Sequence, residues 1–523
     1  MDIHFPDLNP GKQKEFLILI CCLLIGFALR FYTFDQKSLW IDEIHTFHDS
    51  RDGLKDQLKF YKENPTYLHP PLFFVLTHLF HPFEKPERDL RIVPLIFGTL
   101  SIPTIYLLSR LFSPNIALPC TLSLTFMAYH ISLSQDGRSY ALAMFLGMVG
   151  LYFFMKYLQI LKKRYLFLVV PFFVALFYTS YSSIPFIILS QILWLYRINE
   201  KDKKPPFSSL LILNSLILLM CIPWMIFIAS NYKGQPLMNP LFIDDTGSFW
   251  SIMDCVFHDW VPHAPLTVVS IILLILLPVF SKYRRNALFL LAVFFLPMIG
   301  LYLFCKLLNL NHFFDSRYFI NFLSIFFISM YLSLDAIEIR FERSKRIVRL
   351  RFLFVTFFIL SNLIILPLYY QSEKEDHRGL VTSLKSQLRE GDKIFINAMV
   401  YMPGILHYFG AYPEGRHYAA SFGNDSEGIV ELRKSFVHRN QVFTIYHSNT
   451  CCAQYIADGS RLWIIVGTKE DAKELKNNSP CILKGYFDGS FLNFKKFPTD
   501  ASIYLFLWDP KSPNEKGIDV PID

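Results

Sequence analysis

The sequence predicts a polytopic α-helical membrane protein that carries a folded α/β domain at its C-terminal end, and three observations predict it. Hydrophobic residues make up 53% of the 523 residues and charged residues only 18%, whereas about 25% charged residues is usual in soluble domains. Many apolar runs approach roughly 20 residues, the length that a helix needs to cross a bilayer. Most of the remaining polar sequence is collected after residue 371.

The apolar runs predict about eleven transmembrane helices. The expected spans are residues 16–34, 91–111, 115–134, 139–158, 165–180, 182–197, 207–229, 265–281, 287–307, 318–336 and 351–370. We therefore expect a transmembrane domain over residues 1–371, which includes a first outer loop at 35–90, and a second domain over residues 372–523.

One apolar segment, Pro70 to Pro82, is too short to cross a bilayer unaided. It opens with two prolines, which favour a helix start, and we expect an interfacial helix. If this segment does not cross, the basic clusters between later spans all fall on one side, as the positive-inside rule requires of the cytoplasm. The N-terminus is then cytoplasmic, and the C-terminal domain lies outside a plasma or inner membrane.

The tail after residue 371 has the pattern of a small α/β domain. Apolar residues recur at helical spacing between His377 and Arg389, and Gly391 follows as a stop. Short β-rich runs then predict strands, at residues 393–397, 441–446, 461–466 and 503–508. The cysteines of the tail, Cys451, Cys452 and Cys481, are equally compatible with one disulfide and with free thiols.

Composition and motifs exclude several classes of function. The net charge of +8 comes from short basic clusters between apolar runs, without any nucleic-acid-reading motif, so no nucleic-acid partner is expected. The sequence contains no glycine-rich phosphate loop, nucleophile elbow or HExxH zinc motif. This absence favours a reaction whose donor is already activated and arrives within the membrane.

The first outer loop holds two candidate catalytic residues, the adjacent acids Asp42 and Glu43, a few residues beyond the first span. Two carboxylates there could act as a general base or bind a divalent ion, and a solvated acid pair is the simpler alternative. His69 closes the same loop in front of Pro70-Pro71. Either the two prolines stiffen the backbone and hold His69 at the membrane surface, or His69 is an incidental residue at a helix start.

Two arginines are expected at the outer ends of later spans. Arg138 and Tyr140 lie at the outer ends of the third and fourth spans, and Arg317-Tyr318 lies at the outer start of the tenth. A guanidinium at this depth either snorkels to the interface or holds a lipid phosphate, which its planar fork can bind bidentately. A metal site at Asp42, Glu43 or His258 is only weakly indicated, because the spacing matches no known ligand signature. No cofactor is assigned, and a divalent metal remains open.

These stretches, in this order, resemble the membrane glycosyltransferases of the GT-C class, and particularly the branch of protein O-mannosyltransferases and the aminoarabinose transferases that modify lipid A. The matching stretches are Leu39 to Glu43, His69 to Leu72, Leu90 to Pro94 with Gly98, Gly137 to Leu142, and Arg317-Tyr318. The resemblance implies a GT-C-like fold and a sugar donor linked to a polyprenyl phosphate.

The resemblance also implies roles for the residues. Asp42 is implied as the base or acceptor-positioning acid, with Glu43 as its partner. Arg91, Arg138 and Arg317 are implied as contacts of the anionic donor or supports of the site. His69 stands where some relatives carry a lysine that is proposed to contact the phosphate, so the resemblance implies a donor contact there. Tyr140 and Tyr318, which lie in the matching stretches, are expected at the same phosphate site.

We therefore expect a glycosyltransferase, with inversion at the anomeric carbon, that transfers a sugar from a polyprenyl-phosphate donor on the extracytoplasmic side. The acceptor can be a lipid, a protein or a glycan, and the sugar is not specified. The alternatives are a lipid-linked sugar flippase or transporter, a non-catalytic subunit, and a polysaccharide polymerase or ligase. Transport is disfavoured because the charges collect at the outer edge and no repeated halves are evident.

Overall fold

The chain is described here from a computed structural model. The described residues are 10–51, 53–63, 69–80, 82–195, 205–231, 249–279, 284–307, 316–342, 349–398, 400–412, 423–424, 430–448, 459–491, 499–512, 515–520 and 522. They form two compact units: the helical unit (residues 1–34, 61–80 and 91–367) and the mixed unit (residues 35–60, 81–90 and 368–523). Each is described by itself.

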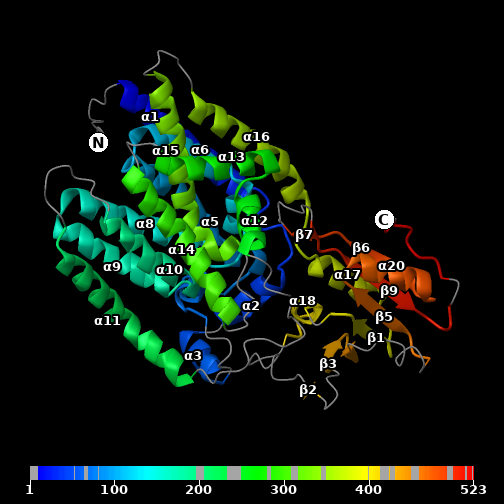
Figure 1. Cartoon of the computed structure of the whole chain (residues 1–523). Coiled ribbons are helices and arrows are strands. Elements are labelled where there is room, and N and C mark those ends of the chain that lie inside the picture. Colours follow the sequence, from blue (N-terminus) through cyan, green and yellow to red (C-terminus); the bar gives the residue numbers. More distant parts are fainter. Residues whose placement is uncertain are drawn as a thin grey trace, which may run out of the picture. The chain divides into compact units, whose positions relative to one another are not determined.

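In the described part of the chain, each predicted apolar segment contains helix. Neighbours such as α8, α9 and α11 pack side by side (Figure 1). The elements of the helical unit are α1 (Pro10–Phe31), α4 (Leu72–His78), α5 (Pro86–Arg110), α6 (Pro114–Phe126), α7 (Ala128–Ser134), α8 (Tyr140–Ile160), α9 (Lys163–Phe177), η1 (Tyr181–Ser183), α10 (Ile184–Leu189), η2 (Ser190–Leu195), α11 (Phe207–Asn231), α12 (Phe249–Trp260), α13 (Ala264–Leu276), η4 (Leu277–Val279), α14 (Arg284–Leu307), η5 (Ser316–Phe322), α15 (Leu323–Glu342) and α16 (Leu350–Gln371). The first residues of α5 and the last of α16 belong to the mixed unit, as does most of α3 (Leu54–Glu63).

Within the described residues, five helices are long and apolar enough to cross a membrane, and six if the bent pair α6 and α7 is one span. The five are α5, α8, α11, the η5–α15 pair and α16. Several other predicted spans are shorter or divided, such as the one over residues 182–197, which consists of η1, α10 and η2. The count of eleven crossings stays a prediction.

The segment from Pro70 forms a helix, α4, of only 7 residues. Its first backbone N–H, from Leu72, donates to the carbonyl of Tyr178 (2.9 Å), and Phe73, Phe74 and Thr77 are buried. A helix of this length cannot cross a bilayer. This agrees with the predicted helix, and its interfacial position stays a prediction.

The helix that carries the predicted third span is broken at Met127, where α6 and α7 meet at 61°. A break frees backbone groups that would be costly to leave unpaired in an apolar surrounding. The guanidinium of Arg30 donates to the carbonyls of Leu124 (2.9 Å) and Thr125 (3.2 Å). The N–H of Ala128 donates to the side-chain oxygen of Asn362 (2.8 Å). Side chains from α1 and α16 therefore provide hydrogen-bond partners for backbone groups on both sides of the break.

Arg30→Met is expected to lower the free energy of unfolding by about 2–4 kcal/mol, because it leaves buried carbonyls without donors. Denaturation in mixed micelles measures this loss. Arg110→Met is the matched control, because the Arg110 side chain is 41% exposed and its ion pair with Glu15 is long, at 3.5 Å. Equal stability of the two variants would contradict the capping role of Arg30.

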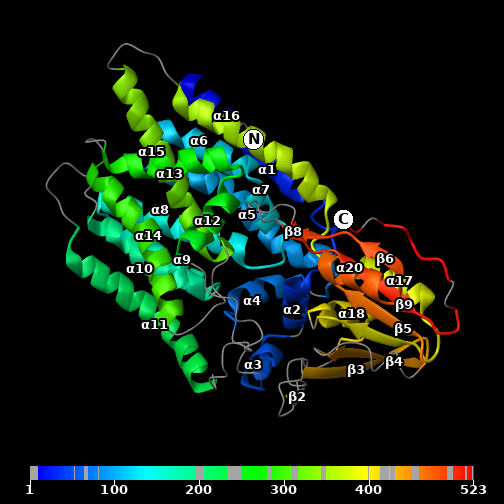
Figure 2. The same ribbon diagram turned by 45° about the vertical axis from the view of Figure 1, so that its right-hand side comes forward.

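The mixed unit is built on a seven-stranded sheet in the order β2-β3-β4-β1-β5-β9-β6 (Figure 2). β1 runs parallel to β4 and β5, and the other pairs are antiparallel. The strands are β1 (Lys393–Ile396), β2 (Gly423–Asn424), β3 (Val430–His438), β4 (Gln441–Ser448), β5 (Leu462–Val466), β6 (Ile482–Phe487) and β9 (Ile503–Trp508), with β7 (Ser490–Phe491) and β8 (Thr499–Asp500) as a separate pair. The predicted strands are confirmed as β1, β4, β5 and β9.

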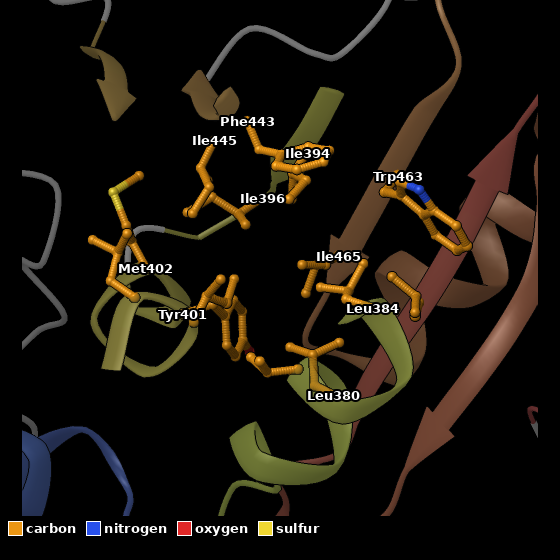
Figure 3. Close-up of a cluster of buried hydrophobic side chains, with 14 of the residues drawn as sticks. Leu380, Leu384, Ile394, Ile396, Tyr401, Met402, Phe443, Ile445, Trp463 and Ile465 are labelled. Carbon is orange, nitrogen blue, oxygen red and sulfur yellow. The ribbon is translucent and has the colours of Figure 1, made fainter. Parts of the chain in front are cut away.

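Alternation along the strands builds a core on each face of the sheet. Ile394 and Ile396 of β1 pack on one face with α17 (His377–Gln387) and α18 (Tyr401–Phe409), as Figure 3 shows. Phe395 faces the other core, which includes Ala472 of α20 (Lys469–Asn478). The C-terminal domain is thus an α/β domain, as predicted. Cys481 is a buried free thiol, and the other two tail cysteines lie outside the described residues.

The predicted domain boundary differs from the structural one. Residues 35–60 and 81–90 of the first outer loop belong to the mixed unit, although the sequence prediction assigned the whole loop to the transmembrane domain. The physical reason is an apolar cluster in which Leu39, Ile44 and Leu90 are fully buried and pack with Tyr408 and Tyr412. Such a cluster depends on contacts distant in sequence, which hydropathy along the chain does not reveal.

Candidate functional site

The acid pair of the first loop lies at the start of a helix, α2 (Ile41–Ser50). Asp42 is half-buried, whereas Glu43 is fully buried. The backbone N–H of Trp40, the residue that precedes the helix, donates to Glu43 Oε2 at 3.4 Å. Carboxylates in the first turn are favoured by the positive end of the helix dipole. Of the two acids, Glu43 is in a capping position and Asp42 is the one with access to solvent.

The chain that enters α2 is held by residues of the C-terminal domain. The N–H of Ser38 donates to Glu373 Oε2 (2.8 Å), and the N–H of Leu39 donates to the Tyr408 hydroxyl (2.7 Å). Burial raises the pKa of both Glu373 and Tyr408. The Tyr408 hydroxyl also donates to Glu87 (3.0 Å). The backbone segment directly before α2, residues 38–40, is therefore held in place by hydrogen bonds as well as by the apolar cluster.

The later turns of α2 carry a histidine cluster that the sequence analysis did not single out. His48 Nε2 lies 3.1 Å from His407 Nδ1 of α18, and the His48 ring stacks on Tyr412 at 3.5 Å between centroids. The Tyr412 hydroxyl lies 3.2 Å from His45 Nδ1. Burial lowers the pKa of His407 to about 4, so at neutral pH its ring is uncharged and one nitrogen of the pair donates to the other.

This cluster predicts acid sensitivity of the mixed unit. Because the folded-state pKa of His407 is about 4 and its ordinary value is 6.5, its contribution to stability is present above pH 6.5 and is lost as the pH falls toward 4. The loss amounts to about 3 kcal/mol. Thermal unfolding between pH 7.5 and pH 4.5 should show a smaller decline for His407→Gln than for the parent. An identical decline would refute this assignment, and His78→Gln serves as the control.

In the helical unit, the two expected arginine motifs meet. The guanidinium carbon of Arg317 lies 5.7 Å from the ring centroids of both Tyr140 and Tyr318. The two tyrosine rings are 6.4 Å apart in a T-shaped arrangement. Residues that are far apart in the sequence, at the start of α8 and in η5, therefore surround one cation. Arg138 is half-buried, in the same turn that leads into α8.

The segment that carries Arg317 is anchored by its neighbour, Ser316, which is fully buried. The Ser316 hydroxyl donates to Asp259 Oδ2 and lies 2.6 Å from the Tyr129 hydroxyl of α7. Asp259 belongs to α12, which lies between the expected spans 207–229 and 265–281. This anchor was missed by the sequence analysis, because the three residues come from separate segments.

The turn before α8 depends on a close helix contact. A side-chain carbon at Gly98 would lie 2.1 Å from Ser134 Oγ, so only glycine lets α5 and α7 approach this closely. Ser134 is followed by Gln135 and Asp136, both buried. This contact gives the physical reason for the Gly98 that the resemblance singled out.

The remaining predicted donor contacts lie in different surroundings. Arg91 is buried, and its Nη1 donates to the carbonyl of Phe34 (3.0 Å), which favours a structural role. His69 is half-buried and its ring lies 6.0 Å from that of Phe74. His69, Arg91, Arg138, Tyr140, Arg317 and Tyr318 belong to the helical unit, and Asp42 and Glu43 to the mixed unit. The convergence of the acids with the arginines stays a prediction.

Among the described residues, no group of three or more His, Cys, Asp and Glu side chains could hold a metal ion. His258 pairs with Asp254 of the same helix, with 3.0 Å between Nδ1 and Oδ1. Metal binding at Asp42, Glu43 or His258 therefore gains no support from these surroundings.

No protein-family model matches the sequence, and no curated protein matches it. Two crystal structures of ArnT from Cupriavidus metallidurans have a similar fold, each with a TM-score of 0.52. The apo structure is 10% identical over 95% of this chain and 98% of that one. The structure bound to undecaprenyl phosphate is 11% identical over 94% of this chain and 98% of that one. The fold is thus similar to that of ArnT, as the resemblance implied: a set of apolar helices with a C-terminal sheet domain.

Proposed function

We propose that the protein is an integral membrane glycosyltransferase that moves a sugar from a polyprenyl-phosphate donor to an acceptor on the extracytoplasmic side. The observation that carries this proposal is the fold, which matches ArnT along nearly the whole chain, and ArnT binds undecaprenyl phosphate in one of its structures. The N-terminus is cytoplasmic and the mixed unit faces the outside, as the basic clusters require.

The acceptor reacts at the acid pair. Asp42 removes the proton of an acceptor hydroxyl, and the oxygen attacks the anomeric carbon of the sugar. The new carbon–oxygen bond forms as the bond to the phosphate oxygen breaks, and the polyprenyl phosphate leaves with both electrons of that bond. A single displacement inverts the anomeric centre. Glu43 is fully buried in the first turn of α2, where it accepts the N–H of Trp40. We assign it the role of stabilising the start of the helix and not of transferring the proton.

The donor phosphate is held in the helical unit. Arg317 supplies a charged planar donor, and Tyr140 and Tyr318 surround it with rings whose hydroxyl groups can also donate. Arg138 and His69 are the further contacts of the anion. Arg91 supports the site through its bond to Phe34. The positive charge of these groups stabilises the phosphate as negative charge develops on it during departure.

A transporter of lipid-linked sugars would use a broken helix as a ligand site. The one break that stands out among the described spans, between α6 and α7, does not favour this reading. Its freed carbonyls and N–H are already bound by Arg30 and Asn362. These backbone groups therefore do not need a substrate as their hydrogen-bond partner.

The test is comparative mass spectrometry of envelope lipids, glycans and glycoproteins from cells with and without the gene. We expect one sugar to be missing from one acceptor class, and its polyprenyl-phosphate form to accumulate. The purified protein should then restore the transfer in liposomes that contain this donor. Unchanged envelope chemistry, together with no transfer in liposomes, would refute the proposal.

A further inference from the structure

We propose that Glu375, supported by His377, is a positioning residue for Asp42. Glu375 belongs to the short segment that joins α16 to α17, more than 300 residues after Asp42 in the sequence. Glu375 Oε2 accepts the N–H of Ile41, the first residue of α2, at 3.2 Å. This role rests on the proposed function, because Glu375 can only position Asp42 for catalysis if Asp42 is the catalytic base.

The first N–H groups of a helix have no partner within the helix. At α2, Glu375 supplies the acceptor for the N–H of Ile41, the residue directly before Asp42. A carboxylate at this end also interacts favourably with the helix dipole. Since Asp42 is the next residue, a shift of the Ile41 backbone moves the Asp42 carboxylate with it.

Glu375 is itself held in place. The same oxygen, Oε2, lies 3.0 Å from His377 Nε2. The His377 side chain is fully buried and the Glu375 side chain is 10% exposed. The ring lies flat against α18, where a side-chain carbon added at Gly404 would come within 2.4 Å of His377 Cγ. The position of Ile41 therefore depends on a continuous series of contacts that runs from Gly404 through His377 to Glu375.

Neighbouring contacts point the same way. The Arg378 N–H donates to Ser38 Oγ (3.2 Å), and the Lys374 ammonium lies 4.6 Å from the Trp40 ring centroid. Glu373 also accepts the N–H of Ser38. Several residues of segment 373–378 therefore contact residues 38–41, which lead into α2. A segment that only connected α16 to α17 would not require so many contacts with the start of α2.

The first experiment does not depend on turnover. Hydrogen exchange followed by mass spectrometry on the full-length protein should show faster exchange of the peptide covering residues 38–47 in Glu375→Ala than in the parent. Glu375→Gln, which keeps an acceptor oxygen, should exchange nearly as slowly as the parent. Glu390→Gln is the matched control, because its carboxylate contacts Gln441 at the surface. Unchanged exchange in Glu375→Ala would overturn the proposal.

The second experiment measures transfer. Glu375→Ala should lower kcat by about 10- to 100-fold with little change in the KM for the donor, because misplacing a reacting group by about 1 Å has effects of this size. Gly404→Ala, which displaces His377 without removing a polar group, should change kcat in the same direction. Glu375→Gln should restore most of the rate. Faster exchange with an unchanged kcat would overturn the positioning role.

A double variant separates this inference from the proposed function. If Glu375 acts through Asp42, Glu375→Ala should cause no further loss in a protein that already carries Asp42→Asn. A full additional loss would mean that Glu375 acts elsewhere and would overturn the inference. If Asp42→Asn alone leaves turnover intact, the proposed role of Asp42 fails, whereas the exchange result still tests the contact.

Discussion

Asp42→Asn is expected to lower kcat by about 10²- to 10⁴-fold, because asparagine cannot take a proton from the acceptor. This corresponds to about 3–5 kcal/mol of lost transition-state stabilisation. The donor KM should change little, since the proposed phosphate contacts lie on other residues. The rate of transfer from a polyprenyl-phosphate sugar, measured in liposomes under saturating donor, checks this result.

The variant should fold. Asp42 is half-buried in the first turn of α2, and asparagine has nearly the same size. The lost charge at the helix start is worth only about 0.3–1 kcal/mol. Asp56→Asn is the matched control, since Asp56 is an exposed acid of the same loop in the first turn of α3. It should leave kcat unchanged.

Turnover of Asp42→Asn within about threefold of the parent would contradict general-base catalysis, which contributes at least roughly a hundredfold. Such a result would fit an acceptor that arrives already ionised, such as a phosphate, and would leave orientation as the only task for Asp42. The pH dependence of kcat distinguishes these cases, because loss of a base removes the acidic limb of the profile.

The helical segments could be predicted because each apolar run is a local property of the sequence. Within the described residues, each of the eleven expected spans contains helical elements. The break at Met127 could not be predicted, because it is stable only with Arg30 and Asn362 as partners, and neither is near it in sequence. The same limit explains the domain boundary, where Leu39 and Leu90 pack with Tyr408 of the C-terminal domain.

The candidate site was predictable in its residue types rather than in their contacts. Arg317 and Tyr140 were singled out separately, and the structure joins them around one ring cluster. Glu43 was expected as a catalytic partner of Asp42. Its full burial and the hydrogen bond that it accepts from the Trp40 N–H favour a helix-capping role instead. Burial of a charged side chain is decided by tertiary packing, which the pattern Asp-Glu does not encode.

Arg317→Lys is expected to weaken binding of the polyprenyl phosphate about tenfold, and Arg317→Ala about a hundredfold, because a hydrogen bond to a charged group contributes about 1.5–3 kcal/mol. Lysine keeps the charge but lacks the planar fork that binds two phosphate oxygens at once. Native mass spectrometry with undecaprenyl phosphate measures the affinity, and the donor KM should rise in parallel.

Arg340→Lys is the control for this series, because Arg340 is exposed near the end of α15. The contact with the two tyrosines provides a second comparison. If the rings of Tyr140 and Tyr318 only hold the cation, lysine at position 317 would satisfy them almost as well as arginine, since both cations interact with aromatic faces. A tenfold difference between arginine and lysine therefore has to come from the anion. Equal affinity in the parent and Arg317→Lys would assign the guanidinium to ring packing or to the membrane interface, and would remove Arg317 from the phosphate site.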